Sequence, residues 1–175
     1  MKQGFIIITL LCLATSKLLA QVSHSNTGLA VGNEAPEIKL PNPEGDTIAL
    51  SSLRGKIVLI DFWASWCAPC LKEQPGLRSL YKKHAQSVFV NAYGFEIYSV
   101  SLDSKKAEWA NAIKKFKMNW AQVSDLKFWN SGAANLYNVD EIPFNLLIDG
   151  NGIIVARDLH GKDLNKELLQ LVKKN

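Results

Sequence analysis

Two cysteines separated by two residues, Cys67 and Cys70, are the side chains of this sequence best suited to chemistry. They follow a run of branched and aromatic apolar residues at 57–62, and the residues after them are typical of a helix. At this spacing two thiols at a helix start can close a small disulfide with little backbone movement, and a C-x-x-C pair near a strand and a helix is a sign of redox chemistry. The pattern therefore indicates reversible thiol–disulfide exchange.

The expected helix start distinguishes the two cysteines. Only a thiolate attacks a disulfide, and a free thiol is mostly protonated near neutral pH. Unpaired N–H groups and the positive dipole end in the first helical turn stabilise an anion, so we expect them to favour the thiolate of Cys67. Cys70, one turn further in, would then attack the mixed disulfide formed at Cys67. We interpret Cys67 as the attacking thiol and Cys70 as the resolving thiol.

Three alternative roles for the cysteine pair have less support in the sequence. A structural disulfide would close a very short loop and remove little entropy from the unfolded chain. A zinc site needs about four ligands, and the sequence has no second cysteine pair or histidine cluster to supply them. Two inert buried thiols would leave the flanking Trp66 and Pro69 unexplained. We therefore expect neither a metal ion nor a cofactor.

The region around the cysteines resembles a known family. Residues 58–70, VLIDFWASWCAPC, resemble the active-site strand and helix of the thioredoxin family, and residues 71–75, LKEQP, are similar to its ResA/TlpA-like extracytoplasmic branch. The resemblance covers the chain from about residue 29 to the C-terminus. It implies an α/β thioredoxin-like fold, with a central mixed sheet flanked by helices and an N-terminal β-hairpin addition.

Two acidic residues are candidates for moving the proton of the resolving thiol. Glu73 follows Cys70 by three residues, so both lie on one helix face, and the resemblance supports a functional carboxylate there. Asp61 interrupts an apolar strand, where burial would raise its pKa and let it store a proton for Cys70. The alternatives are a solvated helix charge for Glu73 and a strand edge for Asp61. Which acid handles the proton stays open.

A third group of residues is expected to bind the substrate. Residues 133–143, AANLYNVDEIP, resemble the family segment that ends in a cis-proline opposite the thiols. The resemblance implies a cis bond between Ile142 and Pro143, with backbone groups of Ile142 presented to a substrate strand. An ordinary trans bond is the alternative. The family usually has Thr after this proline, where this chain has Phe144, which leaves the groove shape open. Trp66 is expected to shield Cys67 or to contact partners, with plain packing as the alternative.

The elements that must position these residues follow from the apolar pattern and the turn residues. The sequence predicts a hairpin (37–40 and 47–50), the central strand, a helix from Cys67 to His84, and a strand at 94–103. An irregular aromatic stretch (118–129), a short helix (131–137), two strands (144–149 and 153–157) joined by a Gly-Asn-Gly turn, and a last helix follow. Asp103 or Ser104 is expected to cap the second helix, and Asp163 the last one. We expect His84 and His160 to be structural or surface residues.

The N-terminus predicts export. Lys2 is followed by an apolar run at 5–14, so residues 1–20 are expected to be a signal peptide cleaved after Ser16 or Ala20, or else an uncleaved anchor. We expect a flexible lead-in at 21–34 and one domain at 35–175. Whether residues 1–20 are cleaved or remain as an anchor, we expect the domain to lie outside the cytoplasm, in the periplasm. The net charge of +4 gives no electrostatic footprint for nucleic acid.

Together these patterns predict a thiol–disulfide oxidoreductase that reduces disulfides in exported proteins and is reset by a membrane electron donor. The resemblance suggests cytochrome c maturation as its setting and apocytochrome c as a substrate. One alternative is a non-enzymatic binding module or holdase. Another is a peroxiredoxin-like peroxidase, although such enzymes carry Thr three residues before the reactive cysteine, where this chain has Ala64. The substrate, the direction of electron flow and the oligomeric state stay open.

Overall fold

The computed structural model describes residues 26–173, which are organised around a five-stranded mixed sheet of order β5-β4-β3-β6-β7. The central strand β3 (Ile57–Trp63) pairs in parallel with β4 (Phe95–Ser101) and antiparallel with β6 (Phe144–Ile148). Strand β5 (Ala121–Val123) extends the parallel side, and β7 (Ile154–Arg157) extends the antiparallel side. Both β3 and β4 are buried along their whole length, which explains their nearly continuous apolar sequences. The predicted fold class is confirmed.

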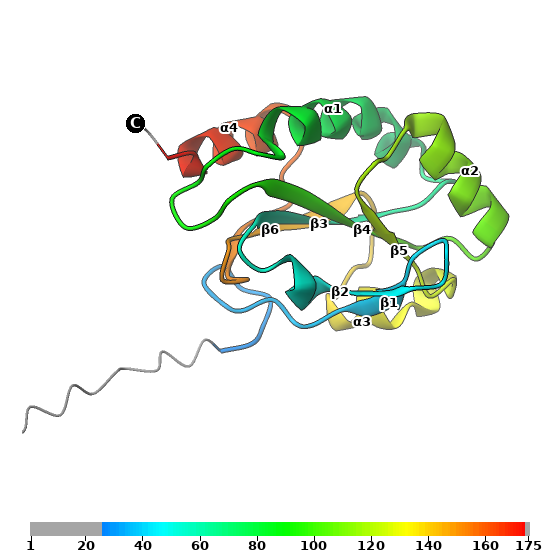
Figure 1. The fold of residues 1–175 in the computed structure, drawn as a ribbon. Helices are drawn as coiled ribbons and strands as arrows, with labels where there is room; N and C mark the ends of the chain where they lie inside the picture. Colours follow the sequence, from blue (N-terminus) through cyan, green and yellow to red (C-terminus); the bar gives the residue numbers. More distant parts are fainter. Residues whose placement is uncertain (1–25, 174–175) are drawn as a thin grey trace, which may run out of the picture.

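Helices cover one face of this sheet. The helix α1 (Ala68–His84) lies beside α4 (Gly161–Leu171) above the sheet in Figure 1, and α2 (Lys106–Phe116) packs on the other side of α1. Leu164 and Leu168 of α4 are both buried, because their spacing of four places them on the side that faces the sheet.

The predicted hairpin lies on the opposite face, together with α3 (Gly132–Leu136) (Figure 1). Its strands are β1 (Lys39–Pro41) and β2 (Thr47–Ala49), followed by a short 3₁₀ helix, Leu50–Leu53. Two buried tyrosines attach it to the domain. The hydroxyl of Tyr98 donates to the carbonyl of Ile48 at 2.8 Å, and that of Tyr137 donates to the carbonyl of Pro36 at 2.5 Å.

Both predicted helix caps are wrong. The N-cap of α2 is Lys105 and that of α4 is His160, and neither side chain makes a capping hydrogen bond. Asp163 lies in the first turn of α4, where a carboxylate still interacts favourably with the helix dipole. Asp103 is fully buried and has another role, described below. The stretch predicted to be irregular also contains β5 and a 3₁₀ helix, Phe128–Asn130.

The segment before the hairpin differs from the expected flexible lead-in over residues 26–34. The amide of Gly32 donates to the carbonyl of Ile154 at 2.8 Å, and the amide of Ile154 donates to the carbonyl of Asn33 at 2.9 Å. The segment therefore lies along the outer edge of β7. The predicted signal peptide and residues 21–25 lie outside the described residues. Between residues 26 and 173, no helix has the length and apolar character needed to cross a membrane.

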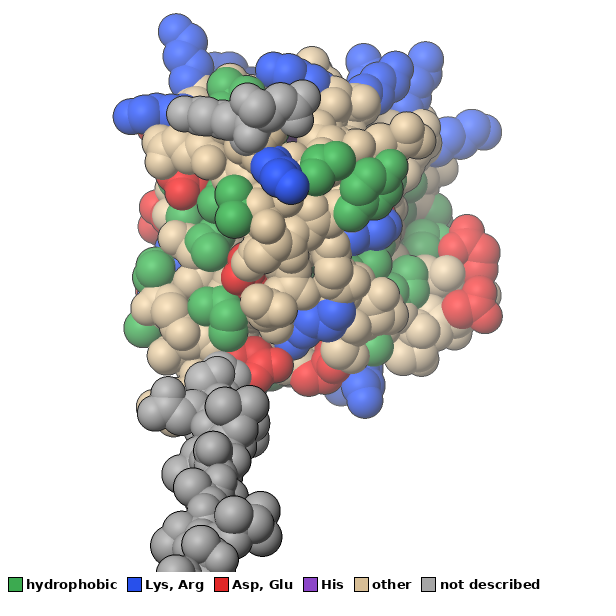
Figure 2. Space-filling model, turned by 60° about the vertical axis from the view of Figure 1, so that its left-hand side comes forward, with side chains coloured by type: hydrophobic (Ala, Val, Ile, Leu, Met, Phe, Trp, Pro, Cys, Tyr) green, Lys and Arg blue, Asp and Glu red, His purple; other side chains and the backbone are tan. Residues whose placement is uncertain are grey.

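Charged side chains are unevenly spread over the surface. Figure 2 shows Lys and Arg side chains projecting mainly from the helical layer at the top of that view. The last turn of α1 carries Lys82 and Lys83, where positive charge interacts favourably with the negative end of the helix dipole.

Gly150 and Gly76 allow a matched test of the close packing between the turn at Gly150 and the backbone of Asn91. The carbonyl of Gly150 accepts the amide of Gly55 at 2.8 Å, and a Cβ at Gly150 would collide with the carbonyl oxygen of Asn91. We expect Gly150→Ala to destabilise the protein by about 1–3 kcal/mol. A Cβ at Gly76, inside α1, meets no atom within 4 Å, so Gly76→Ala should stabilise by up to about 1 kcal/mol. Urea unfolding of both variants measures the difference, and equal effects would contradict this packing.

Candidate active site

Cys67 and Cys70 form a disulfide where β3 leads into α1, with an S–S distance of 2.05 Å. Cys67 is the N-cap of α1, and its sulfur accepts the backbone amide of Cys70 at 3.2 Å. The first cysteine is 5% exposed and the second 1% exposed. The expected position at the strand–helix junction is confirmed, and the N–H group of Cys70 in the first turn of α1 faces the sulfur of Cys67.

The loop before the cysteines is fixed by a buried carboxylate that we had expected to cap a helix. Asp103 accepts the amide of Ser65 at 3.0 Å and its hydroxyl at 2.6 Å, and also accepts the hydroxyl of Ser101 at 2.7 Å. Because β3 and β4 are parallel, their carboxyl ends meet at one edge of the sheet, where these residues lie. Asp103 therefore ties the entrance of the cysteine segment to the neighbouring strand.

The segment ending in Pro143 lies opposite the disulfide. The bond between Ile142 and Pro143 is cis, as the resemblance implied. The carbonyl oxygen of Ile142 lies 3.7 Å from the sulfur of Cys67, although the residues are 75 positions apart. Phe144 is half-buried, with its ring 6.3 Å from that of Phe62 and 5.7 Å from the guanidinium of Arg157.

Trp66 belongs to an aromatic cluster beside the cysteines. Its ring centre lies 5.2 Å from that of Phe128 and 6.1 Å from that of Trp129. Trp66 is 44% exposed and Phe128 is 42% exposed. The cluster, formed by Trp66, Phe128 and Trp129, therefore presents apolar surface next to Cys67.

Asp61 lies in the central strand rather than at an edge, which excludes the alternative of a solvated strand-edge carboxylate. It is 2% exposed and accepts the hydroxyl of Ser99 at 3.1 Å. The indole N–H of Trp120 donates in turn to that hydroxyl at 2.9 Å. Burial outweighs this hydrogen bond and raises the pKa of Asp61 to about 7, so the carboxyl takes up and releases a proton near neutral pH.

Glu73 has a partner that the sequence did not indicate. Its carboxylate lies 2.9 Å from Nδ1 of His160, whose Nε2 lies 3.0 Å from the carboxylate of Asp158. Burial opposes the charged imidazole, but the hydrogen bond with Asp158 and the charge of Glu73 outweigh it and raise the pKa of His160. Glu73 and His160 also act on Asp61: the former raises its pKa and the latter lowers it. The acids and this histidine form one electrostatic network.

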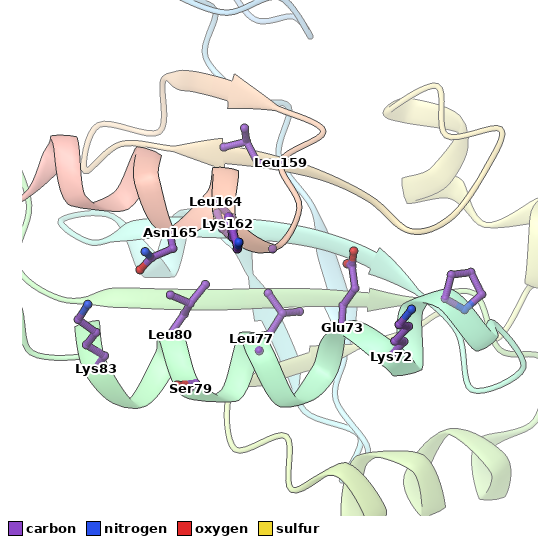
Figure 3. Close-up of a pocket in the computed structure, with 13 residues that line it drawn as sticks. Lys72, Glu73, Leu77, Ser79, Leu80, Lys83, Leu159, Lys162, Leu164 and Asn165 are labelled. Carbon is purple, nitrogen blue, oxygen red and sulfur yellow. The ribbon is translucent and has the colours of Figure 1, made fainter.

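Glu73 opens onto a groove of about 700 Å³ between α1 and α4. Figure 3 shows Glu73 and Lys72 at one end of the groove and Lys83 at the other, with leucines between them. Pro69, inside the disulfide loop, lies in the same wall. The groove therefore connects the neighbourhood of the cysteines with solvent. Within residues 26–173 no cluster of three or more His, Cys, Asp or Glu side chains is arranged to hold a metal ion.

The family of the chain follows from comparison with known proteins. The model of the AhpC/TSA family matches residues 31–157, which include the disulfide, both acids and the cis-proline. The chain belongs to the AhpC/TSA family. Within it, the chain is 31% identical over 150 residues to the thiol-disulfide oxidoreductase ResA of Bacillus subtilis, covering 86% of this chain and 79% of that protein. ResA of Bacillus cereus is 30% identical over 153 residues, covering 87% and 83%.

Solved structures agree with this assignment. The C-terminal domain of a putative thiol-disulfide oxidoreductase from Bacteroides thetaiotaomicron matches with a TM-score of 0.74 and 34% identity, covering 82% of this chain and 96% of that one. The thioredoxin domain of a Bacteroides vulgatus thiol-disulfide oxidoreductase matches with a TM-score of 0.75 and 34% identity, covering 83% and 100%. The present AhpC/TSA protein is thus a thiol–disulfide oxidoreductase of thioredoxin-like fold, as the resemblance implied.

Removal of the Asp103 carboxylate tests its anchoring role. Asp103→Ala leaves the amide and hydroxyl of the half-buried Ser65 and the hydroxyl of the buried Ser101 without an acceptor, so we expect a loss of about 3 kcal/mol in unfolding free energy. Asp163→Ala is the matched control, because it removes an acid that only interacts with a helix dipole, with an expected loss below about 1 kcal/mol. Chemical denaturation of the oxidised proteins measures both values. Similar losses in the two variants would contradict the anchor.

Asp61→Asn tests the raised pKa. The folded state holds the proton of Asp61 more tightly than the unfolded chain does, so this contribution to stability is present at low pH. It is lost as the pH rises from about 4 to about 7. Asn cannot ionise, so the variant should gain up to about 4 kcal/mol over the wild type across this interval, with no further gain above it. Denaturation of the oxidised proteins between pH 4 and pH 9 measures the gap, and a pH-independent difference would refute the assignment.

Proposed function

We propose that the protein reduces disulfides in exported proteins through a Cys67–Cys70 dithiol. The observation that carries this proposal is the sulfur of Cys67 at the N-cap of α1, in contact with the amide of Cys70. These N–H groups favour the thiolate, the form that attacks a disulfide. Cys67 is accordingly the nucleophile and Cys70 the resolving thiol.

The exchange proceeds in two steps. The thiolate of Cys67 attacks one sulfur of the target disulfide, forms a mixed disulfide and releases the other target sulfur as a thiolate. Cys70 then loses its proton and attacks the sulfur of Cys67, which releases the second target thiol and leaves Cys67–Cys70 oxidised. The target gains two electrons, and a membrane electron donor returns two to the protein. Glu73 accepts the proton of Cys70, and Asp61, with its pKa near 7, is the second candidate.

The acids also favour the reducing direction. A dithiol protein is a strong oxidant when its reduced form is stabilised. Here Glu73, one turn after Cys70, and Asp61, which interacts with Glu73, are sources of negative charge that oppose an accumulation of thiolate. The helix start therefore stabilises the reduced state, whereas the acids destabilise it. This destabilisation favours the donation of electrons by the cysteine pair.

The surroundings of Cys67 suit an extended polypeptide target. The backbone of Ile142, next to cis Pro143, lies at the sulfur and can pair with a substrate strand. The aromatic cluster around Trp66 adds apolar contact area beside it. Together with the leader predicted at residues 1–20, these features support exported proteins as substrates and a periplasmic location. The resemblance suggests apocytochrome c and cytochrome c maturation as a specific case.

The two alternative functions make different demands on the site. A peroxiredoxin-like peroxidase would need a hydroxyl three residues before the reactive cysteine, where the buried Ala64 has none. A binding module would need the surface around Trp66 but no sulfur chemistry.

A Cys70→Ser variant tests the proposal, because its mixed disulfide with Cys67 cannot be resolved. Expressed with its leader, it should accumulate disulfide-linked exported proteins that mass spectrometry identifies. Cys67→Ser is the matched control and should trap none. The wild-type dithiol should also reduce a model disulfide protein, whereas both variants lose turnover. Full biological activity of the double Cys→Ser variant would favour the binding module, and peroxide consumption without a thiol partner would favour the peroxidase.

A further inference from the structure

The contact between His160 and Glu73 extends the proposed proton transfer. We propose that His160 is a positioning residue that holds the carboxylate of Glu73, three residues after Cys70 on α1, and passes its proton to and from solvent. This inference rests on the proposed role of Glu73 as proton acceptor. The two ends of the imidazole ring, the groove and the surrounding charges support it.

Both ring nitrogens of His160 face a carboxylate. Nδ1 lies 2.9 Å from Glu73 and Nε2 lies 3.0 Å from Asp158, the first contact being an ion pair without the alignment of a hydrogen bond. A neutral imidazole carries only one N–H and presents a lone pair at its other nitrogen. Two carboxyl groups can therefore lie at these distances in only two protonation states. Either both ring nitrogens of His160 carry a proton, or one nitrogen is unprotonated and the carboxyl group facing it carries the proton. With Asp158 on the Nε2 hydrogen, the remaining proton resides on Nδ1 or on Glu73.

This arrangement lets a proton move with little motion of heavy atoms. When Cys70 gives its proton to Glu73, the adjacent Nδ1 of a neutral His160 can accept it, which restores the Glu73 carboxylate and creates a charged imidazole. His160 then releases the proton to solvent. Its side chain is 36% exposed and that of Glu73 28% exposed, and the neighbouring Leu159 and Gly161 line the groove that Glu73 enters (Figure 3). No electrons are exchanged in this relay, because the thiolate of Cys70 keeps its electron pair for the attack on Cys67.

The groups around His160 act on the charge of its imidazole in opposite directions. Burial and the positive end of α4, of which His160 is the N-cap, oppose the charged ring, whereas Asp158 and Glu73 favour it. The charged groups that face His160 or share its surroundings are Asp158 on its own loop, Glu73 and Lys72 on α1, Asp61 on β3, and Lys162 and Asp163 in the first turn of α4. The favourable partners prevail, so the imidazole is charged over a wider range of pH than in an isolated histidine.

Two substitutions separate the charge of His160 from its ability to titrate. His160→Gln removes both the charge and the titration, whereas His160→Lys keeps a positive charge that does not titrate near neutral pH. Lys162→Gln is the matched control, because it removes a cation from the groove wall two positions away. Reaction of each reduced protein with Ellman's reagent, followed by stopped flow from pH 5 to pH 9, releases one thionitrobenzoate in the attack of Cys67 and a second in the attack of Cys70.

We expect His160→Gln to slow the second release about 10-fold at pH 7 and to change its pH profile, with the first release within about 2-fold of wild type. His160→Lys should lose the imidazole-dependent part of the profile, and Lys162→Gln should follow wild type throughout. Carboxyl NMR supplies a readout without turnover: loss of the His160 charge should raise the pKa of Asp61. If His160→Gln fails to fold, Asp158→Asn, which releases the other end of the ring, should show the same change at smaller size.

Several results would overturn the relay. Identical pH profiles for wild type and His160→Gln would refute it, and equal slowing of both releases would indicate a merely structural role. Glu73→Gln distinguishes the proposed role of His160 from the proposed role of Glu73 as proton acceptor, on which it rests. If Glu73→Gln slows the second release and His160→Gln does not, only the role of His160 fails. If Glu73→Gln has no effect, the proposed proton acceptor fails as well.

Discussion

The start of α1 directly after a buried strand is the constraint on which the rest of the structure depends. The strand β3 is held from both sides by β4 and β6, so its end has a fixed position, and Asp103 fixes the loop that follows. The free N–H group of Cys70 in the first helical turn therefore reaches the sulfur of Cys67 in a defined geometry. A flexible loop with the same two cysteines could close a disulfide, but it would not hold the N–H groups on one sulfur. The rigid sheet thus provides the electrostatic difference between the two thiols.

The site balances opposing electrostatic effects rather than maximising one. The helix N-terminus favours negative charge at Cys67, while burial and the charge of Glu73 disfavour negative charge at Asp61. Ser99 moderates the effect of burial on Asp61 by donating a hydrogen bond to its carboxylate. His160, paired with Glu73, adds a positive charge that opposes the acids. Such opposition leaves the carboxyl of Asp61 titratable near neutral pH, which suits an exchange reaction in which protons leave and return in each cycle.

The sequence alone was sufficient to predict those structural features that depend on neighbouring residues or carry a distinctive motif. The apolar run of β3 and the cysteine spacing predicted the central strand and the disulfide at a helix start, and the family resemblance of residues 133–143 implied the cis bond before Pro143. Prediction from the sequence failed where one short polar residue could have two different local roles. Asp103 follows a strand and precedes a helix, so a cap was the natural expectation, yet the parallel pairing of β3 with β4 brings Ser65 to its carboxylate instead. The partnership of His160 with Glu73 joins residues 87 positions apart and depends on where α4 crosses α1, for which no local pattern exists.

The N-terminal segment along β7 has a consequence for how the protein meets other chains. An unpaired sheet edge offers a row of donors and acceptors to any extended polypeptide and favours aggregation. Backbone groups of residues 32–35 pair with this edge at Ile154, where β7 begins, and at Gly152 before it. A protein that handles unfolded, disulfide-bearing clients would be especially exposed to unproductive strand addition. Because the segment covers the start of this edge, a substrate strand would be directed toward the backbone of Ile142, the docking place proposed above, whose carbonyl oxygen lies 3.7 Å from the sulfur of Cys67.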